Sequence, residues 1–338
     1  MGVISLVKAL IARLFFGVHG VIVIWRVTTI YDSYYFYALL APLVLLIAEM
    51  GVTLKCTDTG EWKWMCPSVL LYLLSVVPCM WLLQLDLYSD RIEYRDENDL
   101  DSCVAETSYN ESTLEAVQGV TIPVSLSSDK WVLVFELTIL FLLILGRWLL
   151  PKGALTRDQL SQLLLVYVGM AADILEFSLE SLKEPTVFCD LTLIVIVLII
   201  WSWSLTQFTL VLTSVAGKRR RVVLQDGSRS CSEECCSCCM CCQNEMWSMI
   251  ITLLMQDIPF LAMRLYLMIQ FNVFNIMMVF FTCKNVLVIL LQGYRMMILC
   301  GNNEVAPEDD TDEEAKADDA RNSPPGAPDK AMVVVESK

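Results

Sequence analysis

Five ionisable side chains lie inside long apolar stretches of the sequence: Asp173, Glu176, Asp257, Arg264 and Lys284. Asp173 and Glu176 are three residues apart, so a helix places both carboxylates on one face. Asp257 and Arg264 are seven residues apart, which is two helical turns along one side. Charged groups within a membrane are costly, so such residues are candidates for function. The chemistry that they predict is the handling of protons or cations.

The same five residues have a second interpretation, in which they form ion pairs between helices and fix the packing. Three acids and two bases nearly balance, which favours pairing of Asp173 or Glu176 with Arg264 or Lys284. A transporter would more naturally carry an internal repeat, and none is visible in the sequence. Pro259 lies between Asp257 and Arg264 and predicts a kink there.

A cysteine cluster is the second chemical feature, and two explanations compete for it. Cysteines next to a membrane are preferred sites of S-palmitoylation, and the nearby Lys218-Arg219-Arg220-Arg221 block would favour anionic lipid. The rival is zinc, since two C-x-x-C pairs occur, but the pairs abut and no histidine is near. The sequence therefore favours acylation over a metal site and over cysteines with neither role, at seven residues: Cys231, Cys235, Cys236, Cys238, Cys239, Cys241 and Cys242.

Three further residues are candidates for modification outside the membrane. Asn110-Glu111-Ser112 is a glycosylation sequon. Cys103 and Cys189 fall on the same predicted side of the membrane, where they form either one disulfide or two free thiols.

Enzymatic motifs are missing from the sequence. His19 is the only histidine, and no metalloprotease, nucleophile-elbow or P-loop signature is present. We therefore expect a protein that is not an enzyme and that has no cofactor and no metal site.

The elements that must position these residues are membrane-spanning helices. The chain of 338 residues is 56% hydrophobic and 18% charged, whereas soluble domains carry about 25% charged residues. A bilayer core needs about 20 apolar residues per helix. The sequence thus predicts an all-α polytopic membrane protein with eight spans, at about 4–25, 35–54, 66–85, 131–150, 159–179, 190–212, 246–267 and 273–299.

Charge distribution predicts how the chain is oriented. The net charge of −14 lies almost wholly in two segments: residues 86–130 hold 11 acids and 3 bases, and residues 301–338 hold 11 acids and 4 bases. Bases in the other segments between spans are concentrated on the side of the N-terminus, which the positive-inside rule makes cytosolic. Both termini are then cytosolic, and the Asn110 sequon is lumenal or extracellular.

The predicted organisation is a transmembrane domain over residues 1–300 and a disordered acidic cytosolic tail over residues 301–338. The domain includes a long, flexible, lumenal or extracellular loop at 86–130 and a Cys-rich cytosolic loop at 217–245. The tail has low hydrophobicity and high charge, so it cannot bury enough surface to offset its ordering entropy.

Several motifs resemble the transmembrane protein 26 family. They are GRWLLP at 146–151, LTRDQLSQLLL at 155–165, AADILEF at 171–177, WSWS at 201–204, QDIPFL at 256–261 and the last span from Lys284-Asn285 to Arg295. The resemblance implies a multi-pass membrane protein, and it carries over no catalytic or transport residues. The Cys-rich loop and the acidic tail depart from the family.

The function expected from the sequence is that of a non-enzymatic membrane adaptor or signalling component with a lipid-anchored Cys-rich loop. The alternative is an ion channel or transporter with a polar pathway through the membrane. The expected partners are the lipid bilayer and proteins that bind the cytosolic loop or the tail, and nucleic acid is excluded because the net charge is acidic. Oligomeric state, and the choice between plasma membrane and endomembrane, stay open.

Overall fold

The computed structural model describes residues 3–56, 65–99, 103, 127–150, 157–210 and 246–301. The chain divides into two units, Met1–Met296 and Met297–Lys338. In the second unit, the described residues are the last turn of the final helix. The fold is therefore that of the first unit.

Helices make up almost all of the described chain, and no strand occurs in it. The helices of the first half are α1 (Val3–Tyr31), η1 (Tyr34–Leu40), α2 (Ala41–Cys56), α3 (Pro67–Glu97) and α4 (Ser128–Leu149). Those of the second half are α5 (Arg157–Lys183), α6 (Pro185–Phe188), α7 (Leu191–Thr206), η2 (Gln207–Thr209), the helical residues 246–252, the π-helical turn η3 (Leu253–Asp257), α9 (Ile258–Phe271) and α10 (Ile276–Gly301).

Eight of these segments are long and apolar enough to cross a membrane, which confirms the predicted all-α polytopic fold. They are Leu6–Tyr31, Tyr34–Thr53, Pro67–Glu97, Ser128–Leu149, Leu160–Lys183, Leu191–Thr209, Met246–Phe271 and Ile276–Ile298. The largest difference from the sequence prediction is at the third span. Its helix continues to Glu97, through residues that were expected to belong to the loop at 86–130, because a polar helix can extend beyond the apolar part that hydropathy detects.

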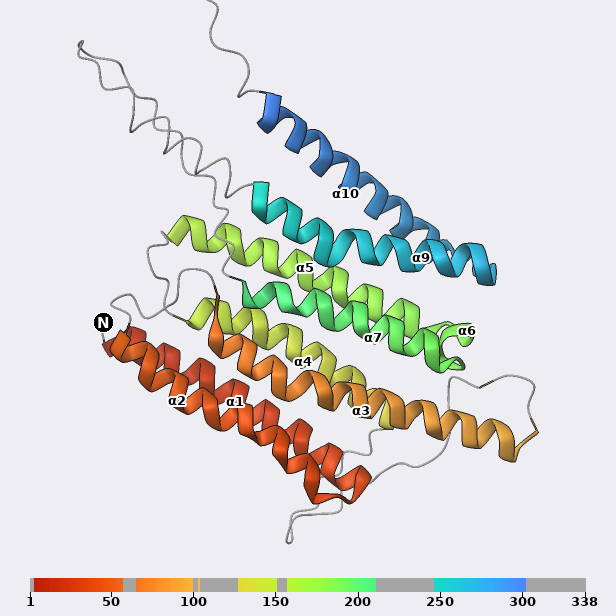
Figure 1. The fold of residues 1–338 in the computed structure, drawn as a ribbon, viewed down its shortest axis with the longest axis horizontal. Coiled ribbons are helices and arrows are strands. Elements are labelled where there is room, and N and C mark those ends of the chain that lie inside the picture. Colours follow the sequence, from red (N-terminus) through yellow and green to blue (C-terminus); the bar gives the residue numbers. More distant parts are fainter. Residues whose placement is uncertain are drawn as a thin grey trace, which may run out of the picture. The chain divides into compact units, whose positions relative to one another are not determined.

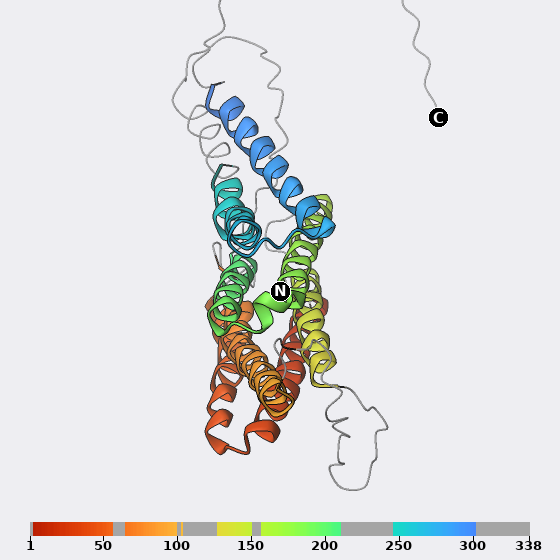
Figure 2. The same ribbon diagram turned by 90° about the vertical axis from the view of Figure 1, so that its right-hand side faces the viewer.

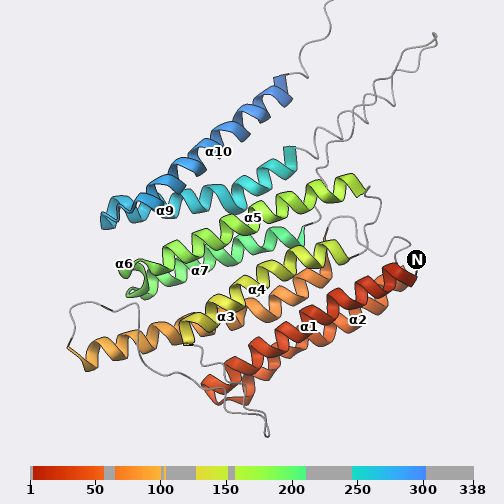
Figure 3. The same cartoon turned by 180° about the vertical axis from the view of Figure 1, so that it is seen from behind.

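The spans stack in pairs, as Figure 1 shows: α1 with α2, then α3 with α4, then α5 with α7, and finally α9 with α10. The pair order follows the contacts, since α3 packs on α2 and α7, while α4 packs on α1 and α5. Figure 2 shows the same stack turned by 90°. Figure 3, seen from behind, shows that α9 and α10 are close at the turn that joins them and diverge away from it. The last pair thus lies at one end of the stack.

Close packing at the other end explains the glycine of the GRWLLP motif. Phe16 of α1 stacks on Tyr72 of α3, with ring centroids 4.6 Å apart. A Cβ at Gly146 of α4 would come within 2.4 Å of the same Phe16 ring. Only glycine therefore lets α4 approach α1 at this point, as small residues do in membrane helix packing.

Candidate functional site

Four of the five charged residues singled out in the sequence meet in one cluster, the charge cluster of Asp173, Glu176, Arg264 and Lys284. Lys284 Nζ of α10 lies 2.5 Å from Asp173 Oδ1 and 3.4 Å from Glu176 Oε2, both on α5. Arg264 Nη2 of α9 lies 3.2 Å from Glu176 Oε1. The two acids on one face of α5 thus each bind a base from another span, as their spacing allows.

Glutamine side chains extend the charge cluster on both sides. Gln256 Nε2 donates to Asp173 Oδ2 at 3.4 Å, and Gln207 Nε2 donates to Gln256 Oε1 at 2.7 Å. Asp257, the fifth charged residue, has no ion pair with any residue that the structure describes; its Oδ2 accepts a hydrogen bond from Gln292 Nε2 at 3.1 Å. A polar chain therefore links η2, the seventh span, α5 and α10. Gln207 and Gln256 were not among the residues predicted for the site, although their polarity within apolar runs was a signal in the sequence.

Aromatic rings enclose the basic members of the charge cluster. The Arg264 guanidinium carbon lies 6.0 Å from the Phe177 ring centroid and 5.1 Å from that of Phe281. Lys284 Nζ lies 5.4 Å from the same Phe281 ring. Phe177 is itself stacked on Phe260 at 4.2 Å. Cation–π contacts strengthen when they are desolvated, so these rings help to hold the charges in the membrane.

A π-helical turn positions Arg264. Pro259 has no N–H and would clash with the carbonyl four residues earlier in a regular α-helix. The turn Leu253–Asp257 precedes it, and the Ile258 N–H donates to the Leu253 carbonyl, five residues back. Such a turn inserts one extra residue into the helix and is frequent at functional sites. The widened turn lies immediately before Pro259, the residue at which the sequence predicts a kink.

The charge cluster is only partly covered by the described chain. The side chain of Arg264 is 2% exposed, and Asp257 is also buried. In contrast, the side chains of Asp173, Lys284 and Glu176 are 31%, 29% and 24% exposed. Ionised groups at membrane depth rarely face lipid, so this opening must be met by water or by protein.

A second intramembrane ion pair lies near the start of the chain. Arg13 Nη2 of α1 is 2.9 Å from Glu49 Oε2 of α2, and Glu49 also accepts hydrogen bonds from the hydroxyls of Thr53 and Ser68. The pair explains how the first span tolerates an arginine. The two residues are 36 positions apart, and no local sequence pattern indicates that they meet.

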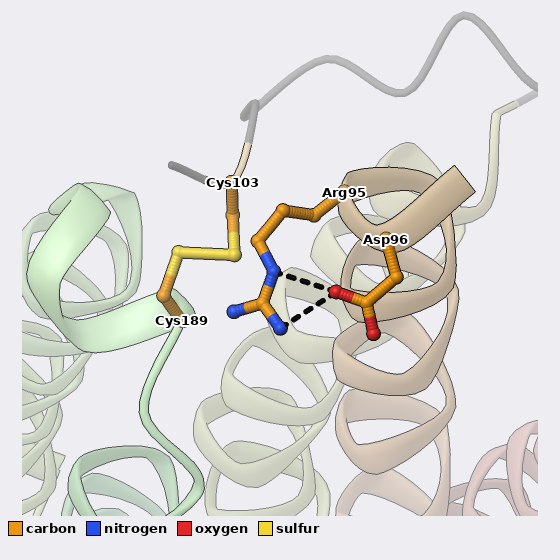
Figure 4. Close-up of a disulfide and its surroundings, with 4 residues drawn as sticks. All are labelled: Arg95, Asp96, Cys103 and Cys189. Carbon is orange, nitrogen blue, oxygen red and sulfur yellow. Dashed lines mark hydrogen bonds and ion pairs between the residues drawn. A yellow bond between two sulfur atoms is a disulfide. The ribbon is translucent and has the colours of Figure 1, made fainter. Parts of the chain in front are cut away.

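The structure brings Cys103 and Cys189 together in a disulfide, shown in Figure 4 beside the Arg95–Asp96 ion pair. Cys103 lies in the segment after α3, and Cys189 lies in the turn between α6 and α7. The bridge thus ties the segment after the third span to the start of the sixth.

Eight of the sequence-predicted site residues lie outside the described residues: Asn110, Cys231, Cys235, Cys236, Cys238, Cys239, Cys241 and Cys242. The same holds for the predicted Cys-rich loop at 217–245 and for the tail after Gly301. Within the described ranges, no group of three or more His, Cys, Asp or Glu residues could hold a metal ion.

Comparison with known proteins places the whole membrane region in one family. No solved structure matches the chain. The family model described as transmembrane protein 26 matches residues 3–295, which include all five charged residues, the disulfide and the Arg13–Glu49 pair. The chain therefore belongs to the transmembrane protein 26 family.

Proposed function

We propose that this multi-pass membrane protein is a non-enzymatic adaptor or signalling component, and that its Cys-rich loop is anchored to the bilayer by S-palmitoylation. In this proposal the eight spans form a fixed body, while the loop at 217–245 and the acidic tail bind protein partners. The protein then acts by bringing its partners together at the membrane, and it needs no cofactor.

The observation that carries the proposal is the pairing of the intramembrane charges. Asp173 and Glu176 are bound by Lys284 and Arg264, and Glu49 is bound by Arg13. Charges that bind one another serve cohesion between helices, since each carboxylate already has its cation. A permeant cation would have to displace Lys284 or Arg264.

The proposed orientation has both termini in the cytosol. The positive-inside bias supports it, and so does the disulfide, because Cys103 and Cys189 both fall on the opposite side, where an oxidising compartment preserves such bonds. The same orientation places the Asn110 sequon in the lumen or outside the cell, and the Cys-rich loop at the inner leaflet. This orientation is equally compatible with a location in the plasma membrane and in an endomembrane.

Lipid anchoring of the loop rests on its composition. Each acyl chain contributes about 0.8 kcal/mol per buried methylene, so two or more chains hold a segment stably at the membrane. The basic block at 218–221 adds about 1 kcal/mol for each base near anionic lipid.

Acyl-exchange labelling tests the anchor. The wild-type chain is compared with a variant in which all seven cysteines between Cys231 and Cys242 are serine, while Cys66, Cys79 and Cys283 remain as internal controls. We expect labelling of the wild type and its loss in the variant. Equal labelling of the two chains would refute the anchor, and zinc that co-purifies with the wild type alone would favour a metal site instead.

The second candidate function is an ion channel or transporter, and the partial exposure of Asp173, Glu176 and Lys284 is the observation that favours it. Proteoliposomes containing the purified protein separate the two functions. An adaptor gives no cation flux above that of empty liposomes. Flux that is present in the wild type and lost in Asp173→Asn would establish the transporter and overturn the adaptor.

A further inference from the structure

Glu136 is an acid within a membrane span that has no ion pair with any residue that the structure describes. It belongs to α4, about 12 Å along the helix from Ser128, and it is 3% exposed. Its neighbours one turn away on the same side of the helix, Val132, Ile139 and Leu140, are apolar and buried. The carboxyl group of Glu136 is therefore enclosed by the protein.

Two uncharged groups from neighbouring helices meet this carboxyl group. Ser178 of α5 and Trp201 of α7 both come within hydrogen-bonding reach of it, and both are buried as well. Glu136 Oε1 and Trp201 Nε1 complete no hydrogen bond within the described chain. An acceptor and a donor thus remain open in one enclosed place, which we call the Glu136 joint, formed by Glu136, Ser178 and Trp201.

The charge cluster supplies no cation to the Glu136 joint. On α5, Glu176 comes two residues before Ser178, so the two side chains point about 160° apart around the helix. Arg264 and Lys284 bind the acids on the side of Glu176. The bases of the charge cluster are therefore separated from Glu136 by the body of α5.

The other neighbouring helices hold a few titratable groups, and each of these has a partner of its own. Nδ1 of His19 on α1 is hydrogen-bonded to the Tyr72 hydroxyl of α3 at 2.8 Å. Asp86 of α3 lies beside Arg26 of α1. The helix α7 carries no charged residue. Within the described chain, no charged group lies close enough to Glu136 to interact with it electrostatically.

An ionised carboxylate in this place would be very costly. A buried charge without a counter-charge costs far more than a buried neutral polar group, so such a group takes its neutral form. Glu49 shows the other solution, because Arg13 binds it at 2.9 Å. The neighbours of Glu136 suit an uncharged carboxyl group instead, since the Ser178 hydroxyl can accept as well as donate and the Trp201 N–H can donate.

We infer that Glu136 is a proton-binding site, at which a neutral carboxyl group joins α4, α5 and α7 by hydrogen bonds. The proton is on one carboxyl oxygen and is donated to Ser178 Oγ, while the other oxygen accepts from the Trp201 N–H. Loss of the proton would leave a negative charge enclosed between three helices, so ionisation is coupled to their separation. This inference is independent of the lipid anchor and of partner binding at the Cys-rich loop.

Infrared spectroscopy of the purified full chain in liposomes at neutral pH tests the inference. A neutral carboxyl group has a C=O stretching band that a carboxylate lacks, and Glu136→Gln removes this one carboxyl group. We expect the wild-type spectrum minus that of Glu136→Gln to contain a carboxylic-acid band and no carboxylate bands. Glu49→Gln is the matched control, because it also removes a glutamate carboxyl group from a membrane span. There we expect the loss of carboxylate bands alone, since Glu49 is paired with Arg13.

Thermal unfolding of the same variants in detergent gives a second readout. The glutamine amide is uncharged and has both a donor and an acceptor, so Glu136→Gln should melt within about 2 °C of the wild type. Glu49→Gln leaves Arg13 buried without its carboxylate and should melt several degrees lower. Loss of carboxylate bands from Glu136→Gln, or a melting temperature as low as that of Glu49→Gln, would overturn the inference. Neither result would alter the acyl-exchange outcome at the Cys-rich loop.

Discussion

At the scale of single residues, Arg264 shows how a charge is accommodated within the membrane. It is almost fully buried, binds Glu176 and lies near the rings of Phe177 and Phe281. An arginine suits this place better than a lysine, because its flat guanidinium can bind a carboxylate and lie against aromatic rings at the same time. Lys284, which is more exposed, contacts two carboxylates as a compact point charge.

Replacing Arg264 should therefore destabilise the helix bundle. Removing one partner of a buried ion pair costs about 3–5 kcal/mol. Glu176 is 24% exposed and keeps Lys284, so we expect Arg264→Leu to cost less than this range, about 2 kcal/mol. Arg264→Lys should fall between this variant and the wild type. Thermal unfolding of the purified protein in detergent measures the effect.

Lys183→Leu is the matched control for that experiment. Lys183 also ends in a cation and belongs to α5, but it is exposed at the end of that helix. Its loss should change stability by no more than about 0.5 kcal/mol. Equal melting temperatures for Arg264→Leu and Lys183→Leu would show that the Arg264 pair does not stabilise the fold.

At the scale of elements, the π-helical turn Leu253–Asp257 sets the register of the seventh span. Because the turn holds one extra residue, each residue of α9 lies about 100° around the helix axis from where an uninterrupted α-helix would place it. That rotation lets Gln256 bind Gln207 and Asp173, while Arg264 still meets Glu176 two turns later. Polar contacts on both sides of Pro259 thus depend on a local departure from α-helical geometry.

Two single-residue deletions test this register. Deleting Leu254 removes the extra residue inside the π-helical turn, so both flanking helices can keep their contacts. Deleting Ala262, which is also exposed, removes a residue from regular α9 and rotates Arg264 by about 100° away from Glu176. We expect the Leu254 deletion to fold and to melt well above the Ala262 deletion in detergent. The reverse order would contradict a role of the turn in setting the register.

The elements also show which features the sequence could predict. Apolar runs revealed all eight spans, because a bilayer demands length and hydrophobicity of each helix separately. The polar extension of α3 to Glu97 was missed, since its residues resemble a loop in composition. For the charge cluster, the sequence predicted that the acids of α5 pair with Arg264 or Lys284, without deciding which acid binds which base. The Arg13–Glu49 ion pair and the Gln207–Gln256 hydrogen bond could not be predicted, because they depend on which helices become neighbours. Local patterns do not encode that choice.

At the scale of the whole molecule, the acidic charge is a property of the segments between and after the spans. Net charge of −8 lies at 86–130 and of −7 at 301–338, which leaves the rest of the chain nearly neutral. In the proposed orientation these two segments face opposite sides of the membrane. The Cys103–Cys189 bridge joins two positions 86 residues apart on the side of the first segment. One experiment on the disulfide therefore reports the orientation of the whole chain.

The expected result follows from which reagents can reach the bridge. Cys103 lies in the segment after α3 and Cys189 between α6 and α7, so both are outside the cell or in the lumen when the termini are cytosolic. In intact cells that display the protein, a membrane-impermeant reductant should change its mobility on non-reducing gels, and Cys103→Ser and Cys189→Ser should each give the same change without reductant. Removal of the glycan at Asn110 by an external glycosidase should follow the same pattern, with Asn110→Gln as its control. The contrary result is a disulfide that only a membrane-permeant reductant can reduce, together with an unglycosylated Asn110. That result would place both termini outside the cell or in the lumen, with the Cys-rich loop on the same, oxidising side. Acylation by enzymes of the cytosolic face could then not occur.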